Sequence, residues 1–219
     1  MRKKWLILLA AFAMIAGAKA EAEIIPTPKS CKVGTGRLDF NTGFRVVGEP
    51  AAAEWLRTDL AKNLTRNPGE ETLVEFKSSV FANPEAYRLV IADRRIQLYA
   101  ASEAGFFCAT GRLLALLEAG NGVLPQLEIT DEPDFSIRGM HLQMPYPEPF
   151  SRSARYRMTE QMLDAMARLG FNYVVFELGG NFQSEHHKSH LKNPWSADEL
   201  TALARYGKAR GITVIPGIN

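Results

Sequence analysis

The sequence predicts an α+β segment followed by parallel β/α units, and three observations support this fold class. In the first half, short runs of alternating apolar and polar residues lie between helices whose apolar residues recur at helical spacing. After Pro133 the order becomes strand, helix, strand, helix, strand. The strands of this second part are almost continuously apolar, as is typical of parallel strands that are buried on both faces.

Composition and charge narrow the class of protein. The 219 residues suit one large domain or two modest ones, and 46% hydrophobic and 23% charged residues are typical of a globular protein. The formal net charge is only +2 and the basic residues are scattered, so we expect no nucleic-acid partner. Cys31 and Cys108 would allow a disulfide in an oxidising compartment but do not require one, and a buried free thiol at Cys108 is the simpler interpretation.

Residues 1–20 have the pattern of a secretory signal peptide. Three basic residues precede an apolar stretch, Trp5–Ile15, and Ala18-Lys19-Ala20 is a small-x-small cleavage site. The apolar stretch is too short to span a bilayer as a helix. We therefore expect cleavage near Ala20 and a periplasmic or secreted protein that does not engage a membrane afterwards. An uncleaved N-terminal anchor is the alternative.

The α+β segment, residues 21–134, is expected to hold a small sheet with helices on one face. Its elements are a strand at 44–47, a helix at 50–64, a hairpin of strands 87–91 and 96–100, a helix at 106–117 and a strand at 126–130. Pro50 suits the first turn of a helix, and Gly120 suits the position just after one. The hairpin alternates apolar and polar residues on both sides of a short turn.

The second segment, residues 135–219, is expected to form three strands and two helices, with strands at 137–142, 173–178 and 212–215. Met158, Met162 and Met166 would form a core stripe on the first helix. Ser196 and Glu199 would make a capping box at the start of the second. Eight such units close a TIM (β/α)8 barrel, in which functional residues follow the strands. Three strands cannot close a barrel, so either the barrel is incomplete in this chain or the architecture is a smaller one.

Several segments, in order along the chain, resemble a known enzyme family. They include Ile25–Pro28, the run Ile129–Met140 with its Arg138-Gly139 pair, and the strand Gly211–Pro216. These segments resemble glycoside hydrolase family 20, the β-N-acetylhexosaminidases. The resemblance implies a non-catalytic α+β domain at 21–134 and the N-terminal part of the catalytic barrel at 135–219. It also implies an exported enzyme that removes terminal N-acetylhexosamine from a glycan by substrate-assisted retaining hydrolysis, without a cofactor.

The chain departs from this family at the ends of its strands. Val175-Phe176-Glu177-Leu178 stands where the family has His-Trp-His-Leu, and Pro216-Gly217-Ile218-Asn219 stands where it has Pro-Glu-Ile-Asp. The family's catalytic aspartate–glutamate pair follows strand four, so the resemblance places it beyond residue 219 and assigns no catalytic residue here. We therefore expect this chain alone to be inactive. The alternatives are a non-catalytic remnant or carbohydrate-binding fragment, and a related glycosidase with altered sugar specificity.

Three residues are candidates for substrate binding. The resemblance implies that Arg138 clamps sugar hydroxyls with its fork of donors, and the alternative is a pair with an acidic residue at 131–134. Glu177 ends a strand on the functional rim of a barrel, where it could accept hydrogen bonds from a sugar or pair with Arg138. The alternative is a surface carboxylate at the start of a loop. Trp195 is one of the loop aromatics that could stack on a sugar ring, and ordinary packing of these aromatics is the alternative. These aromatics are Tyr146, Phe150, Phe182 and Trp195.

The histidines between Glu185 and His190 do not predict a metal site. His186 and His190 would share one face of a helix at i, i+4 spacing. However, the run is a polar loop, and the sequence offers no third ligand at a suitable spacing. We therefore expect neither a metal nor a cofactor.

Overall fold

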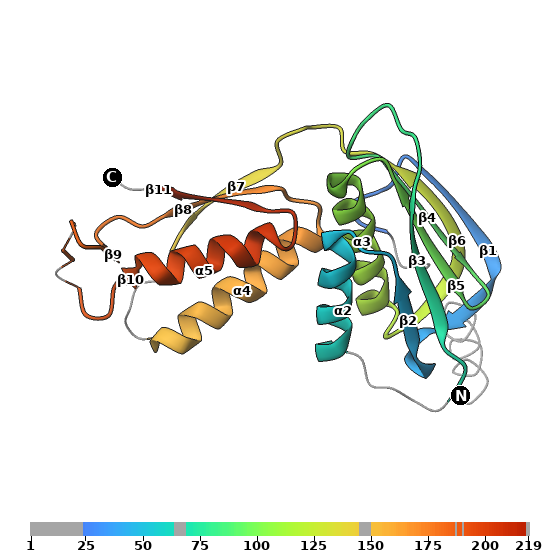
Figure 1. Ribbon diagram of the computed structural model, residues 1–219, viewed down its shortest axis with the longest axis horizontal. Coiled ribbons are helices and arrows are strands. Elements are labelled where there is room, and N and C mark those ends of the chain that lie inside the picture. Colours follow the sequence, from blue (N-terminus) through green and yellow to red (C-terminus); the bar gives the residue numbers. More distant parts are fainter. Residues whose placement is uncertain (1–23, 64–68, 145–149, 187, 190, 218–219) are drawn as a thin grey trace, which may run out of the picture.

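The computed structural model describes residues 24–63, 69–144, 150–186, 188–189 and 191–217. Two sheets stand side by side, each with helices packed on it (Figure 1). The expected signal peptide lies outside these residues. No helix within them is long and apolar enough to cross a bilayer.

The first sheet has six strands in the order β1-β6-β4-β5-β3-β2. The strands are β1 (Ser30–Asp39), β2 (Phe44–Val47), β3 (Thr72–Ser78), β4 (Tyr87–Ala92), β5 (Arg95–Ala100) and β6 (Val123–Asp131). The sheet is mixed, because β2, β3 and β5 run parallel while β4, β6 and β1 pair antiparallel. A short 3-10 helix, η1 (Phe40–Thr42), follows β1. Helices α2 (Ala51–Asn63) and α3 (Glu103–Ala119) cover the face that is turned toward the second sheet (Figure 1).

The predicted hairpin is confirmed as β4 and β5. Its strands pair antiparallel with Leu89 opposite Leu98, and Asp93 takes the left-handed conformation that a tight turn needs. Alternation puts Leu89, Ile91, Ile96 and Leu98 on one buried face. This apolar face is what fixes the register, since a slip by one residue would expose all four side chains.

The sequence pattern does not predict β1 or β3. β1 is an edge strand whose residues are mostly exposed, and its register with β6 is interrupted between Val33 and Arg37. It therefore lacks the apolar alternation by which a strand is recognised. In β3 the charged residues Glu75 and Lys77 interrupt the apolar run, although Val74 is fully buried.

The second sheet has three parallel strands in the order β11-β8-β7. They are β7 (Gly139–Gln143), β8 (Tyr173–Glu177) and β11 (Thr213–Gly217). Helices α4 (Arg152–Arg168) and α5 (Ala197–Lys208) lie on one face of this sheet (Figure 1). Two two-residue strands, β9 (Phe182–Gln183) and β10 (Trp195–Ser196), pair in the loop before α5. The Ser196–Glu199 capping box at the start of α5 is confirmed.

The two faces of the second sheet differ. Val174 and Phe176 are fully buried on the face that α4 and α5 cover. Because side chains alternate along a strand, Val175 and Glu177 point to the other face, together with His141 of β7 and Ile215 of β11. We call this side the open face. Ile215 is 41% exposed, so the expectation that these strands are buried on both faces is not met within the described residues.

The methionine stripe on α4 is only partly where the pattern predicts it. Met166 is buried and Met162 packs against the core, but Met158 is 42% exposed. The buried face of the helix instead runs through Arg155, Thr159 and Leu163. Hydrophobic periodicity misses this face because two of its members are polar.

Helices α3 and α4 join the two sheets. A Cβ atom at Gly111 of α3 would lie 2.7 Å from the backbone oxygen of Ala167, so only glycine permits this approach. Beside this contact, Arg168 of α4 binds Asp59 of α2 at 2.8 Å and Glu118 of α3 at 2.7 Å. The junction therefore combines close packing with ion pairs.

Candidate functional site

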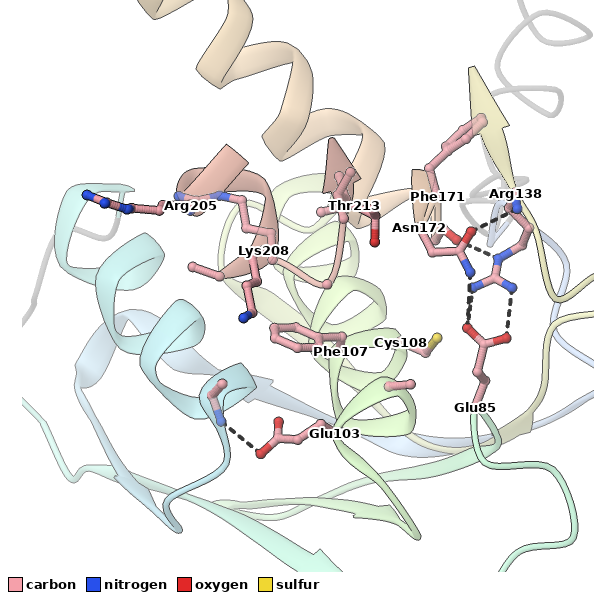
Figure 2. A pocket seen from close by; sticks show the side chains of 18 residues that line it. Glu85, Glu103, Phe107, Cys108, Arg138, Phe171, Asn172, Arg205, Lys208 and Thr213 are labelled. Carbon is pink, nitrogen blue, oxygen red and sulfur yellow. Dashed lines mark hydrogen bonds and ion pairs between the residues drawn. The ribbon is translucent and has the colours of Figure 1, made fainter. Parts of the chain in front are cut away.

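Arg138 lies at the amino edge of the second sheet, the end at which β7, β8 and β11 begin. Its guanidinium forms a two-pronged pair with Glu85, at 3.0 Å from Nη1 to Oε2 and 2.7 Å from Nη2 to Oε1. Nε donates to the backbone oxygen of Gly170 at 2.7 Å (Figure 2). Nη1 also donates to the backbone oxygen of Phe135. The side chain therefore ties the start of β7 to the loop before β4.

The surroundings of Arg138 favour its charged form. Burial alone would lower the pKa of this guanidinium, but the hydrogen bonds and the negative charge of Glu85 outweigh it and raise the pKa. Asn172 supports the same arrangement, since its Oδ1 accepts the backbone N–H of Arg138 at 2.8 Å. Arg138, Glu85 and Asn172 therefore form one hydrogen-bonded network at the amino edge.

Both predictions about the partner of Arg138 need correction. Its guanidinium binds Glu85 at the amino edge of the sheet (Figure 2). A sugar was expected at the opposite edge, where the strands end. The acidic residues at 131–134 do not bind it either, because they have partners of their own. Asp131 pairs with Arg112 at 3.3 Å, and Glu132 and Asp134 pair with Lys29. Arg138 precedes its strand, so its side chain reaches back across the junction instead of forward along the sheet.

A cavity of about 670 Å³ lies beside Arg138, between α3 and the amino edge (Figure 2). Phe107, Phe171 and Ile212 make much of its wall apolar. Cys108 also lines it, and burial raises the pKa of this thiol to about 12. The thiol is therefore protonated at neutral pH and is a poor nucleophile. The two cavity carboxylates are already engaged, Glu85 by Arg138 and Glu103 by the backbone N–H of Ala51.

The carboxyl edge, the end at which the three strands finish, is arranged differently. Glu177 is the last residue of β8 and lies opposite Gly217 of β11. Its Oε2 atom is 3.2 Å from Nε2 of His141. Its Oε1 atom is buried and has no hydrogen-bond partner among the described residues. A carboxylate and an imidazole thus meet on the open face with acceptor capacity left over.

Sequence reasoning finds Glu177 but misses His141. Glu177 is visible because it ends an apolar strand, and the structure places it on the carboxyl edge. His141 is a single polar residue within a short strand, and only the pairing of His141 with Val175 places it on the same face as Glu177. The available signal was its alternation with Gly139 and Gln143, which share that face.

Trp195 does not lie where a sugar could stack on it. The indole is fully buried, and the Arg155 guanidinium lies over its ring with Cζ 4.7 Å from the ring centroid. The expectation that Trp195 contacts substrate is therefore corrected: its ring belongs to the packing between α4 and the loop before α5. Of the other loop aromatics, Phe182 is buried, Phe150 is exposed and Tyr146 lies outside the described residues.

No group of three or more His, Cys, Asp or Glu side chains that could hold a metal ion occurs in the described part of the chain. His186 is exposed, while His187 and His190 lie outside that part. Cys31 and Cys108 are both free thiols, and Cys31 is exposed.

Comparison with known proteins identifies the family to which the chain belongs. Residues 21–132 match Glycosyl hydrolase family 20, domain 2. The chain belongs to glycoside hydrolase family 20. The matched region holds the whole first sheet with α2 and α3. Membership therefore rests on the part of the chain that does not contain the His141–Glu177 pair.

Curated relatives in family 20 are longer than this chain. It is 26% identical over 168 residues to a beta-hexosaminidase from Vibrio vulnificus, which covers 74% of this chain and 19% of the relative. It is 25% identical over 236 residues to a beta-hexosaminidase from Vibrio furnissii, which covers 91% of this chain and 38% of the relative. The chain thus spans less than half the length of each.

Solved structures of family-20 enzymes share this fold. One is an exo β-N-acetylglucosaminidase from Vibrio harveyi in complex with N-acetylglucosamine, with a TM-score of 0.67 and 20% identity over 87% of this chain and 35% of that one. Another is a β-N-acetylhexosaminidase from Bacteroides fragilis, with a TM-score of 0.68 and 21% identity over 89% of this chain and 44% of that one. The likeness extends across both sheets, well beyond residues 21–132.

Proposed function

We propose that this chain is part of an exported β-N-acetylhexosaminidase-like glycosidase that removes terminal N-acetylhexosamine from glycans. The observation that carries the proposal is a family-20 first sheet followed by three parallel β/α strands whose open face has polar residues at its carboxyl edge. The names of the relatives, beta-hexosaminidase and β-N-acetylhexosaminidase, supply the substrate class.

The proposal includes a division of the chain. Residues 1–20 are a signal peptide that directs the protein to the periplasm or outside the cell. Residues 21–134 are a non-catalytic α+β domain, and residues 135–219 begin a TIM (β/α)8 catalytic domain. In such a barrel β7, β8 and β11 are the first three strands, and their carboxyl edge forms part of the active face.

The proposed reaction is substrate-assisted hydrolysis with retention of configuration. The acetamido oxygen of the substrate attacks its own anomeric carbon, so the protein supplies a general acid and a group that orients the acetamide. These two residues are expected beyond residue 219. Within this chain, Glu177 is the proposed substrate-binding residue, and Arg138 holds the junction through Glu85.

An assay of the full-length gene product tests this function. We expect it to cleave an aryl N-acetyl-β-glucosaminide and to release the β-anomer first, as proton NMR of the fresh product would show. The matched control is the aryl β-glucoside, which lacks the acetamide and should be cleaved at least a hundredfold more slowly. Equal cleavage of both substrates, or release of the α-anomer, would contradict the proposal.

One observation favours a second candidate, a family-20 glycosidase with altered sugar specificity. Glu177 and Gly217 stand where the family pattern has a histidine and a glutamate, and these two positions are paired neighbours on β8 and β11. This chain therefore has its carboxylate on β8, whereas the family pattern has one on the neighbouring strand. This candidate would be supported if the full-length protein preferred another aryl glycoside to both the aryl N-acetylglucosaminide and the aryl N-acetylgalactosaminide.

A further inference from the structure

The cavity beside the amino edge has apolar walls that come from both halves of the chain. Phe107 belongs to α3, Phe171 to the loop before β8 and Ile212 to the loop before β11. Gly211 lets the ring of Phe107 approach this last loop, since a Cβ atom there would lie 2.8 Å from Cγ of the ring. The volume of about 670 Å³ is within the range of roughly 300–1,000 Å³ that small-molecule sites occupy, and such sites often lie between domains. These walls suit the apolar part of a small molecule.

Two cations of α5 border this cavity without a counter-charge. Lys208 and Arg205 are both lining residues, and both are exposed. The side chain of Lys208 extends from α5 toward α3 (Figure 2). Neither cation has a hydrogen bond or an ion pair with another residue in the described part of the chain. Both are therefore available to a negatively charged group that enters from solvent.

The other charges of the cavity wall already have partners. Arg138 binds Glu85, and Arg210 binds Asp164. Glu103 accepts a backbone N–H at the start of α2, where the helix dipole favours a negative charge. An anion in the cavity would therefore meet the two cations of α5, and each carboxylate of the wall is already engaged.

The helix dipole alone does not account for this arrangement. Lys208 and Arg205 lie in the last turn of α5, where the dipole favours positive charge. That effect explains why the two residues are basic, but it does not explain why they border a cavity with apolar walls. Lys62 lies in the last turn of α2 and does not line the cavity. It therefore has the same relation to its helix without the relation to the cavity.

We propose that this cavity binds an amphipathic carboxylate whose apolar body lies against Phe107, Phe171 and Ile212. The carboxylate group binds the ammonium group of Lys208, and Arg205 adds a second positive charge at the mouth. The site is separate from the proposed hydrolysis, because it lies at the amino edge of the second sheet and a sugar is expected at the carboxyl edge. Since both halves of the chain form its walls, a bound carboxylate should also stabilise the junction between them.

The test is a calorimetric titration of the full-length protein with octanoate, and with 1-octanol as the uncharged probe of equal chain length. We expect 1-octanol to bind about tenfold more weakly than octanoate, because it lacks the charge. Lys208→Met removes the ammonium group but keeps an apolar side chain, so it should raise the Kd for octanoate about fivefold and leave that for 1-octanol unchanged. Lys62→Met is the matched control and should bind octanoate as the unchanged protein does.

Cys108 shows whether the probe occupies this cavity, because its thiol lines the wall. We expect saturating octanoate to slow the alkylation of Cys108 by iodoacetamide at least fivefold, as measured by mass spectrometry of the peptide that contains it. The exposed thiol of Cys31 is the internal control and should react at the same rate with and without octanoate. In Lys208→Met the same concentration of octanoate should protect Cys108 less.

The proposal would be overturned if octanoate did not bind, or if it bound no more tightly than 1-octanol. It would also be overturned if Lys208→Met bound octanoate like the unchanged protein. Alkylation of Cys108 that octanoate does not slow would mean that the cavity is not the site, as when another part of the full-length chain fills it. Thermal unfolding of Lys208→Met without a probe checks its folding, and Lys208→Arg, which keeps the charge, should retain most of the affinity.

Discussion

The two edges of the second sheet differ in how completely their charges are paired. At the amino edge, Arg138 has two bonds to Glu85 and two to backbone oxygens, and Asn172 closes the network. At the carboxyl edge, Glu177 contacts His141 with one oxygen and leaves the other without a donor in the described structure. In parallel β/α proteins the first edge serves stability and the second serves function. The pairing of charges follows that division within one three-stranded sheet.

The difference has a physical origin. A charge removed from water must be paired and fully hydrogen-bonded, or it opposes folding. The amino edge faces the loop before β4, whose Glu85 supplies the counter-charge to Arg138. The carboxyl edge leads into loops instead, and there Glu177 keeps one buried oxygen without a donor among the described residues.

The largest effect should come from breaking the pair at the amino edge. Glu85→Ala leaves the guanidinium of Arg138 partly buried without its counter-charge, and we expect the free energy of unfolding to fall by about 3 kcal/mol. Urea unfolding followed by circular dichroism measures this. The matched control is Glu128→Ala, which breaks an exposed pair with Arg88 at 4.0 Å and should cost less than about 1 kcal/mol. If both variants lost the same free energy of unfolding, the Arg138–Glu85 pair would be no more important for stability than an exposed surface pair.

The next effect concerns the helix contact that holds the amino edge against the first sheet. Gly111→Ala places a Cβ atom 2.7 Å from the backbone oxygen of Ala167, which α3 and α4 can relieve only by separating. We expect a loss of about 1–3 kcal/mol, as for other overpacked sites. In an exposed helix the same substitution is stabilising by up to about 1 kcal/mol. A stability gain in urea unfolding would show that the helices are not in close contact.

A smaller effect should appear at alkaline pH, through the cavity thiol. Burial raises the pKa of Cys108 to about 12, whereas an unfolded thiol titrates near pH 8.5. Between these values the unfolded state loses its proton first, so stability should fall as pH rises, by at most about 1.4 kcal/mol per pH unit. Unfolding free energies of the protein and of Cys108→Ala, measured from pH 7.5 to pH 9.5, should diverge in slope, by at most about 1.4 kcal/mol in total. Parallel curves would mean that the thiol is not buried.

The smallest effect on stability should come from the carboxyl edge. Glu177→Gln removes a charge that the fold only partly compensates, so we expect the free energy of unfolding to change by less than about 0.5 kcal/mol or to rise. The matched variant at the other edge, Glu85→Gln, should lower it clearly because it weakens the pair with Arg138. If Glu177→Gln were the more destabilising of the two, the carboxyl edge would be a structural element.

Local chemistry explains which parts of the fold the sequence predicts. The β4–β5 hairpin and the Ser196–Glu199 capping box are encoded within a few residues, and both are confirmed. Strand β1 is not predicted, because a strand at the edge of a sheet does not need alternating apolar residues. The buried face of α4 is not predicted either, because two of its residues, Arg155 and Thr159, are polar.

The candidate site is predictable to a similar, limited degree. The position of Glu177 follows from where an apolar strand ends. The partner of Arg138 does not, because Glu85 lies 53 residues away in sequence and the pair exists only once the two sheets meet. The contact between His141 and Glu177 likewise depends on the register between β7 and β8, which no local pattern predicts. The burial of Trp195 depends on Arg155, another contact that no local pattern reveals.

A crystal structure of the full-length protein with bound N-acetylglucosamine would test the contrast between the two edges most directly. We predict that the sugar lies at the carboxyl edge beside Glu177, while Arg138 keeps its two bonds to Glu85. A sugar bound to Arg138, with Glu85 displaced and Glu177 untouched, would contradict it.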